Sequence, residues 1–105
     1  KRLLTAEPDY RPALKTLALL QSRRKDYRSA SETLQKLLLL DPRDPEVWLY
    51  FGDVALFTGD RPAAWTAWQK VGELDAATEE MRRRARTRLE LYQSGQLPAE
   101  AVSSR

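Results

Sequence analysis

The chain of 105 residues has a formal net charge of +3 and contains no histidine and no cysteine. It therefore lacks the usual general base near neutral pH, the usual thiol nucleophile and any thiolate metal site, and we expect neither an enzyme nor a cofactor. No stretch is apolar for the roughly 18 residues that a membrane-spanning helix needs. A domain without cysteine is compatible with a cytoplasmic or a periplasmic location.

The charges are unevenly distributed along the chain. Residues 1–40 hold nine Lys/Arg against four Asp/Glu (+5), residues 41–78 hold three against seven (−4), and residues 79–105 hold six against four (+2). An acidic middle segment thus lies between two basic ends.

The first part of the chain predicts two amphipathic helices. Asp9 is a candidate N-cap for a helix that ends near Arg24 and tolerates Pro12 in its first turn, and Asp26 is a candidate N-cap for the next helix. Apolar residues at three- and four-residue steps share one helical face. On the first helix this face is Leu14, Leu17, Ala18 and Leu20. On the second it is Tyr27, Ala30, Leu34, Leu37 and Leu38.

The middle of the chain repeats this pattern, with clearer signals for where each helix begins and ends. Asp44 is a candidate N-cap with Pro45 in the first helical position, Gly59 can take the left-handed conformation that ends a helix, and Asp60 can cap the next helix before Pro62. The apolar face of the first of these helices is Trp48, Phe51, Gly52 and Ala55. That of the second is Ala64, Trp65, Trp68, Val71 and Leu74. We expect Gly52 to face Trp68 without room for a side chain.

A last helix is predicted from Ala76 or Thr78 to about Tyr92. Glu79 and Glu80 suit its N-terminal end, and its apolar stripe is Met81, Ala85, Leu89 and Tyr92. Its arginines at 82 and 86 occupy the positions that Trp48 and Gly52 occupy in the preceding unit, which indicates a solvated face and hence a capping helix. An alternative stays open, because residues 95–101 echo residues 59–65 and could begin a further helix.

The chain matches itself at a constant offset of about 34 residues. Trp48 falls on Leu14, Gly52 on Ala18, Ala64 on Ala30 and Trp68 on Leu34. The period and the motifs W-x-x-F-G, G-D and A-x-x-x-W, with L-x-x-L-A, D-Y and A-x-x-x-L in the earlier copy, resemble the tetratricopeptide repeat. Lys25, where glycine is usual in the turn, and Ala76, where proline usually ends the repeat, depart from the family pattern.

This resemblance implies an all-α fold, a right-handed α-solenoid of antiparallel helix hairpins. Its expected divisions are the end of a preceding repeat (1–8), two full repeats (9–42 and 43–76), a C-terminal capping helix (77–94) and a tail (95–105). Leu3-Leu4 and Pro8 lie one period before Leu37-Leu38 and Pro42, so we expect the chain to be a fragment of a larger protein.

The resemblance also implies that the first helix of each repeat lines a concave groove. Residues away from the core stripe would face this groove and contact a partner: Lys15, Leu19, Ser22, Arg23, Leu49, Asp53, Leu56, Phe57, Arg83 and Thr87. Apolar positions flanked by cations suit an extended or helical peptide with some negative charge. The family's clamp for C-terminal carboxylates does not carry over, because Leu19, Tyr50 and Glu80 replace three of its five residues.

Two other kinds of site are less well supported. The carboxylates of Asp41, Asp44 and Glu46 lie where helix caps are needed and lack the spacing of a calcium loop, so we expect no metal site. The arginine-rich run at 82–88 is typical of nucleic-acid binding, but its arginines encircle the helix and are not interleaved with aromatic residues, so we expect no nucleic-acid partner.

We therefore expect a protein-protein interaction scaffold that binds a peptide or protein segment in its groove. The alternative is a structural module that docks within its own chain or forms a homo-oligomer, because exposed apolar surface at the N-terminal end favours pairing.

Overall fold

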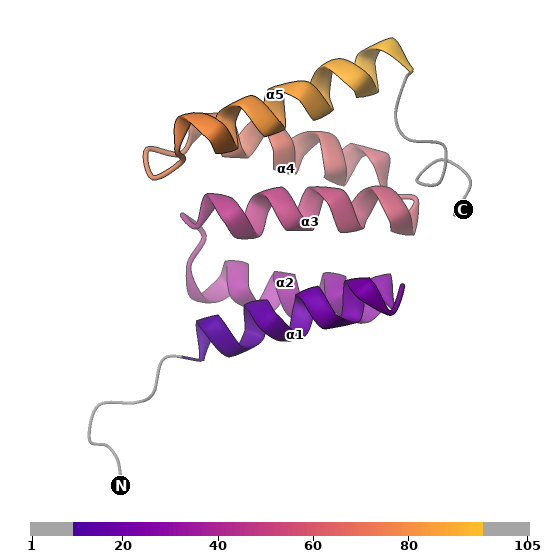
Figure 1. The fold of residues 1–105 in the computed structure, drawn as a ribbon, viewed down its shortest axis with the longest axis vertical. Helices are drawn as coiled ribbons and strands as arrows, with labels where there is room; N and C mark the ends of the chain where they lie inside the picture. The colour runs from indigo at the N-terminus through magenta and orange to yellow at the C-terminus, as the bar shows by residue number, and fades with distance from the viewer. Residues whose placement is uncertain (1–9, 96–105) are drawn as a thin grey trace, which may run out of the picture.

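The computed structural model describes residues 10–95, which form five α-helices (Figure 1). These are α1 (Arg11–Arg23), α2 (Tyr27–Leu40), α3 (Pro45–Thr58), α4 (Arg61–Glu73) and α5 (Glu79–Ser94). Each helix packs against the next one in the chain, and α5 also contacts α3. The described part of the chain is therefore all-α, with sequential helices packed as hairpins.

Side-chain caps set the starts of four helices. Asp26 accepts a hydrogen bond from the backbone N–H of Ser29, and Asp60 accepts one from that of Ala63. Asp44 accepts from the N–H of Glu46 and Thr78 from that of Met81. The sequence-based predictions of these caps are confirmed. Of the two predicted starts of the last helix, Ala76 and Thr78, the structure has Thr78.

The start of α1 differs from the prediction. Tyr10 occupies the N-cap position and makes no side-chain hydrogen bond there, while Pro12 lies in the first turn as expected. Asp9, the predicted cap, lies outside the described residues, as do the predicted repeat end at 1–8 and residues 96–105 of the tail.

The turns between paired helices need a left-handed residue. Gly59 has φ 91° and ends α3 with its N–H directed at the carbonyls of Ala55 and Leu56, as predicted. Lys25 takes the same role after α1 with φ 63°, a conformation that costs roughly 1–2 kcal/mol for a residue with a side chain.

Helix α3 is the centre of the fold, because it contributes to both hydrophobic clusters. Val47 and Val54 pack with residues of α1 and α2, including Ala18, Ala30, Leu34 and Leu37. Leu49, Ala55 and Leu56 pack with residues of α4 and α5, including Ala64, Trp68, Val71 and Ala85. Met81, Leu89 and Tyr92 of α5 pack against this second cluster, which confirms the predicted apolar stripe.

Two leucines that were predicted to point inward are exposed. Leu17 and Leu20 of α1 expose 43% and 48% of their surface. The residues one repeat later, Phe51 and Val54 of α3, pack against the cluster formed with α1 and α2. Among the described helices none precedes α1, so nothing there covers the corresponding face.

The closest approach within the α3–α4 hairpin is at Gly52. A Cβ atom on this residue would lie 2.6 Å from Cδ1 of Trp68 and closer still to Nε1, which confirms the predicted contact. Trp68 is almost fully buried, so its ring can move only at the expense of its other contacts.

We expect Gly52→Ala to destabilise the fold by about 1–3 kcal/mol through overpacking, measured by urea unfolding. Gly72→Ala is the matched control, because a Cβ there meets nothing within 4 Å on the exposed side of α4. The control should stabilise the fold by up to about 1 kcal/mol, since alanine is the better helix former. Equal effects of the two substitutions would contradict this packing of α3 on α4.

Candidate functional site

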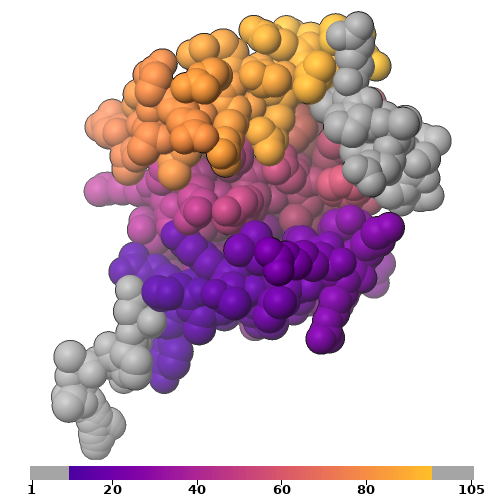
Figure 2. Space-filling model, viewed as in Figure 1, coloured from indigo at the N-terminus to yellow at the C-terminus, as the bar shows by residue number. Residues whose placement is uncertain are grey.

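The helices α1, α3 and α5 lie on the same side of the molecule, with α2 and α4 behind them (Figure 1). We call this surface the α1–α3–α5 face, and it is the surface shown in Figure 2. Every residue of the predicted groove comes from one of these three helices. Their side chains, however, fall into three groups: pocket-lining, internally paired or buried, and exposed.

A pocket of about 140 Å³ opens between α1, α2 and α3. The predicted residues Leu19, Ser22, Asp53 and Phe57 line it. The remaining lining residues were not predicted as site residues: Ala18, Tyr27, Leu34, Tyr50 and Val54. The structure thus brings four of the predicted residues to one apolar pocket.

One wall of this pocket is an aromatic stack. The rings of Tyr27 and Phe57 lie nearly parallel, with centroids 4.6 Å apart and planes inclined by 10°. Phe57 is half-buried and also packs against the cluster of α3, α4 and α5. The expectation that Phe57 lies away from the core is therefore wrong, because its ring joins the start of α2 to the end of α3.

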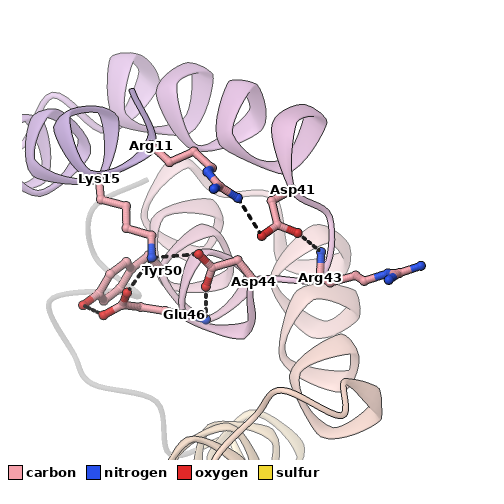
Figure 3. A network of polar contacts seen from close by, with 7 residues as sticks. All are labelled: Arg11, Lys15, Asp41, Arg43, Asp44, Glu46 and Tyr50. Atoms are coloured by element: carbon pink, nitrogen blue, oxygen red, sulfur yellow. Dashed lines mark hydrogen bonds and ion pairs between the residues drawn. The ribbon is translucent and has the colours of Figure 1, made fainter. Parts of the chain in front are cut away.

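The cation of Lys15 is held by two carboxylates (Figure 3). Its Nζ lies 2.7 Å from Oδ2 of Asp44 and 3.0 Å from Oε1 of Glu46, and Oε2 of Glu46 accepts a hydrogen bond of 3.2 Å from the hydroxyl of Tyr50. Next to this group, Arg11 pairs with Asp41 at 3.2 Å. These contacts join α1 to the turn before α3 and its first turn, so Lys15 has partners within the domain.

The same contacts shift two pKa values. Burial lowers the pKa of Lys15, but hydrogen bonds and charges from Asp44 and Glu46 outweigh it and raise this pKa above its ordinary value of 10.5. Burial, and then the carboxylate of Glu46, raise the pKa of Tyr50 above 10.0. At neutral pH the lysine is therefore charged and the phenol remains a hydrogen-bond donor.

Asp53 has three hydrogen-bond donors inside the domain. Its Oδ1 accepts from Nε1 of Trp68 at 3.1 Å and from Nε of Arg88 at 2.6 Å, and its Oδ2 accepts from Nη2 of Arg88 at 3.0 Å. Each member of the Asp53–Arg88 pair exposes only 31% of its side chain. Within the arginine-rich run at 82–88, Arg88 therefore has a structural role.

Two predicted groove residues are buried. Leu49 and Leu56 expose 3% and 7% of their surface and belong to the cluster of α3, α4 and α5. They cannot form a surface for a partner, because α5 packs on the side of α3 from which they project. The positions of these leucines along α3 predicted a groove-facing side, but they could not show that α5 covers that side.

The remaining predicted residues are exposed. These are Arg23 at the end of α1 and Arg83 and Thr87 on α5. Neither arginine forms an ion pair with any residue in the range 10–95, whereas Arg84 pairs with Glu80. Arg23 and Arg83 are therefore exposed cations without an ion-pair partner among residues 10–95.

Other chemistry is not favoured by the described residues. Within residues 10–95 no three acidic side chains come together as a possible metal site. No helix in that range has the length and hydrophobicity needed to cross a membrane. The acidic residues 41, 44 and 46 cap turns and pair with Arg11 and Lys15 instead.

Comparison with known families supports the interpretation of the sequence and the helical hairpins. The family model of the tetratricopeptide repeat matches residues 1–50. Over these residues, just under half of the chain, the sequence is similar to this family. Searches of curated proteins and of solved structures found no significant match. The tetratricopeptide repeat is typically a protein-protein interaction scaffold without catalytic activity, so proteins are the partners that the family implies.

Three side-chain contacts were not predicted from the sequence. Tyr27 packs against the core as predicted and also stacks on Phe57, Tyr50 donates to Glu46, and Arg88 pairs with Asp53. The spacing of Glu46 and Tyr50, four residues apart on one helix, is a signal for their contact. The Asp53–Arg88 pair spans 35 residues, close to one repeat, so neighbouring first helices could have suggested it.

We expect Lys15→Gln to lower the free energy of unfolding by about 1 kcal/mol at neutral pH. Because the pKa of Lys15 is raised in the folded state, this stabilisation is complete below pH 10.5 and is lost as the pH rises through the folded-state pKa. Urea unfolding at about pH 8 and about pH 11.5 should therefore show the variant and the wild type converging.

Lys36→Gln is the control for this experiment, because Lys36 is exposed and forms no ion pair with the described residues. Its effect should be small at both pH values. A difference between Lys15→Gln and the wild type that stays constant with pH would contradict the pairing.

Proposed function

We propose that this domain binds a segment of another protein on the α1–α3–α5 face. The observation that supports this most directly is the apolar pocket of about 140 Å³ between α1, α2 and α3. Pockets that accept a buried side chain are where most of the affinity of a protein interface resides. The family supports the class of partner, and the pocket supports the place.

The charges of the face favour a partner with negative charge. The carboxylates of Asp44, Glu46 and Asp53 are neutralised by Lys15 and Arg88, while Arg23 and Arg83 have no such partner in the described range. Complementary charge steers association and selects the partner. Of the predicted groove residues, we therefore retain Leu19, Ser22, Phe57, Arg23, Arg83 and Thr87 as contacts, and assign Lys15 and Asp53 to its support.

The paired helices support the proposed division of the chain. The hairpin α1–α2 lies within 9–42 and the hairpin α3–α4 within 43–76, while α5 lies within 77–94 and packs against α3 and α4. In this division, α5 closes the core and supplies the second wall of the binding face.

We expect peptides selected from a random library to bind this face. Arg83→Glu should lower the affinity for a selected acidic peptide by about tenfold or more, because like charges oppose binding. Arg61→Glu is the matched control, because Arg61 is also exposed but lies at the start of α4, and it should change the affinity less than about twofold. Calorimetric titration of each variant gives both values.

Failure to select any peptide, or equal weakening by Arg83→Glu and Arg61→Glu, would contradict binding on this face. An oligonucleotide titration serves as a further check. Tight binding with a steep salt dependence would point to nucleic acid instead.

A second candidate function is self-association. Five leucines are exposed on the first hairpin: Leu17 by 43%, Leu19 by 40%, Leu20 by 48%, Leu39 by 85% and Leu40 by 60%. Exposed apolar surface of this kind favours pairing. Sedimentation equilibrium decides between the two: a dimer that Leu17→Glu with Leu20→Glu dissociates would support self-association, and a monomer would support the binding of another protein.

A further inference from the structure

We infer that the pocket between α1, α2 and α3 takes one aromatic or leucine-sized side chain, and that the same partner segment places a carboxylate at Arg23. This inference rests on the proposed function and specifies the chemistry of the bound segment. It is carried by the size of the pocket, the state of its polar groups and the charge at its rim.

The size of the pocket limits its occupant to a single side chain. Its volume is about 140 Å³, and most of its lining is apolar, from Ala18, Leu19, Leu34, Val54 and the Tyr27–Phe57 stack. An apolar protein cavity of about 150 Å³ binds one benzene ring. The pocket therefore suits a phenyl ring or a branched aliphatic side chain.

The polar groups of the pocket do not favour a charged occupant. The hydroxyl of Tyr50 donates to Glu46, and the carboxylate of Asp53 is paired with Arg88 and Trp68. The other polar side chains of the lining, Ser22 and Tyr27, offer neutral hydroxyls. A cationic or anionic side chain would lose its hydration in this pocket without gaining a full partner.

The rim of the pocket carries positive charge. Arg23 lies one helical turn after Leu19, which lines the pocket, so the two side chains share a face of α1. Arg24 and Lys25 follow directly and are also exposed. The nearest acid in sequence, Asp26, caps α2 by accepting from Ser29. A carboxylate on the partner next to its apolar anchor would therefore meet an unneutralised cation.

The test is a nuclear magnetic resonance titration of the whole chain with three small probes. N-acetylphenylalanine carries the ring and the carboxylate, its amide carries the ring alone, and N-acetylglycine carries the carboxylate alone. We expect N-acetylphenylalanine to bind with a Kd on the order of 1 mM. Nuclear Overhauser contacts should join its ring to the methyl groups of Ala18 and Val54.

The comparison among probes tests the two parts of the inference. The amide should bind about two- to fivefold more weakly than the acid, as expected for a contact with an exposed charge. N-acetylglycine should not shift the resonances of the pocket. Equal affinity of acid and amide, or ring contacts outside the pocket, would overturn the inference without requiring any variant.

Two substitutions sharpen the result. Ser22→Leu fills the mouth of the pocket and should abolish the ring contacts. Ser31→Leu is its matched control, because Ser31 is a half-buried serine of α2 that lines a different hollow, with Arg28, Glu32, Gln35 and Thr58. Arg23→Gln should remove the preference for the acid over the amide.

If folded Ser22→Leu keeps the ring contacts, the pocket is not the site of the ring. If Arg23→Gln keeps the preference for the acid, Arg23 does not bind the carboxylate. This failure is distinguishable from failure of the proposed function. Selected peptides could still bind the α1–α3–α5 face and respond to Arg83→Glu while leaving the pocket empty.

Discussion

The carboxylate of Asp53 joins three helices of this domain. It projects from α3, accepts from the indole of Trp68 on α4 and forms a two-point ion pair with Arg88 on α5. A half-buried carboxylate would be costly without such partners, and the guanidinium matches its geometry with parallel hydrogen bonds. This contact adds to the apolar packing of Met81, Leu89 and Tyr92 that holds α5 beside α3 and α4.

The internal ion pairs also determine the charge that a partner meets. The middle of the sequence is acidic, yet Lys15 and Arg88 neutralise its carboxylates on the α1–α3–α5 face. Exposed cations such as Arg23 and Arg83 come from the basic ends of the chain. In the proposed function, the acids of the domain serve its stability and the remaining bases serve recognition.

Much of the fold follows from local chemistry and was predictable from the sequence. Caps such as Asp60, the left-handed Gly59 and the apolar period fix where helices begin and end, and the internal repeat implies that Gly52 meets Trp68. The site was less predictable. Spacing along a helix shows which residues share a face, but burial depends on the neighbouring helix, so Leu49 was misplaced.

Pairing between distant residues was the other limit on prediction. The sequence shows the charge of a residue such as Arg88 but not whether an acid on another helix lies within reach. Its exposure therefore could not be inferred from the helical pattern alone.

The most direct test is a double-mutant cycle of Asp53→Asn and Arg88→Met, measured by urea unfolding. Asparagine keeps an oxygen for the indole of Trp68, but it removes the charge and the second acceptor that Arg88 uses. We expect a coupling free energy of about 1–2 kcal/mol between the two positions, as for contacting charged residues of which a third remains exposed. Effects that add to within about 0.3 kcal/mol would show that the pair does not hold α5 on α3.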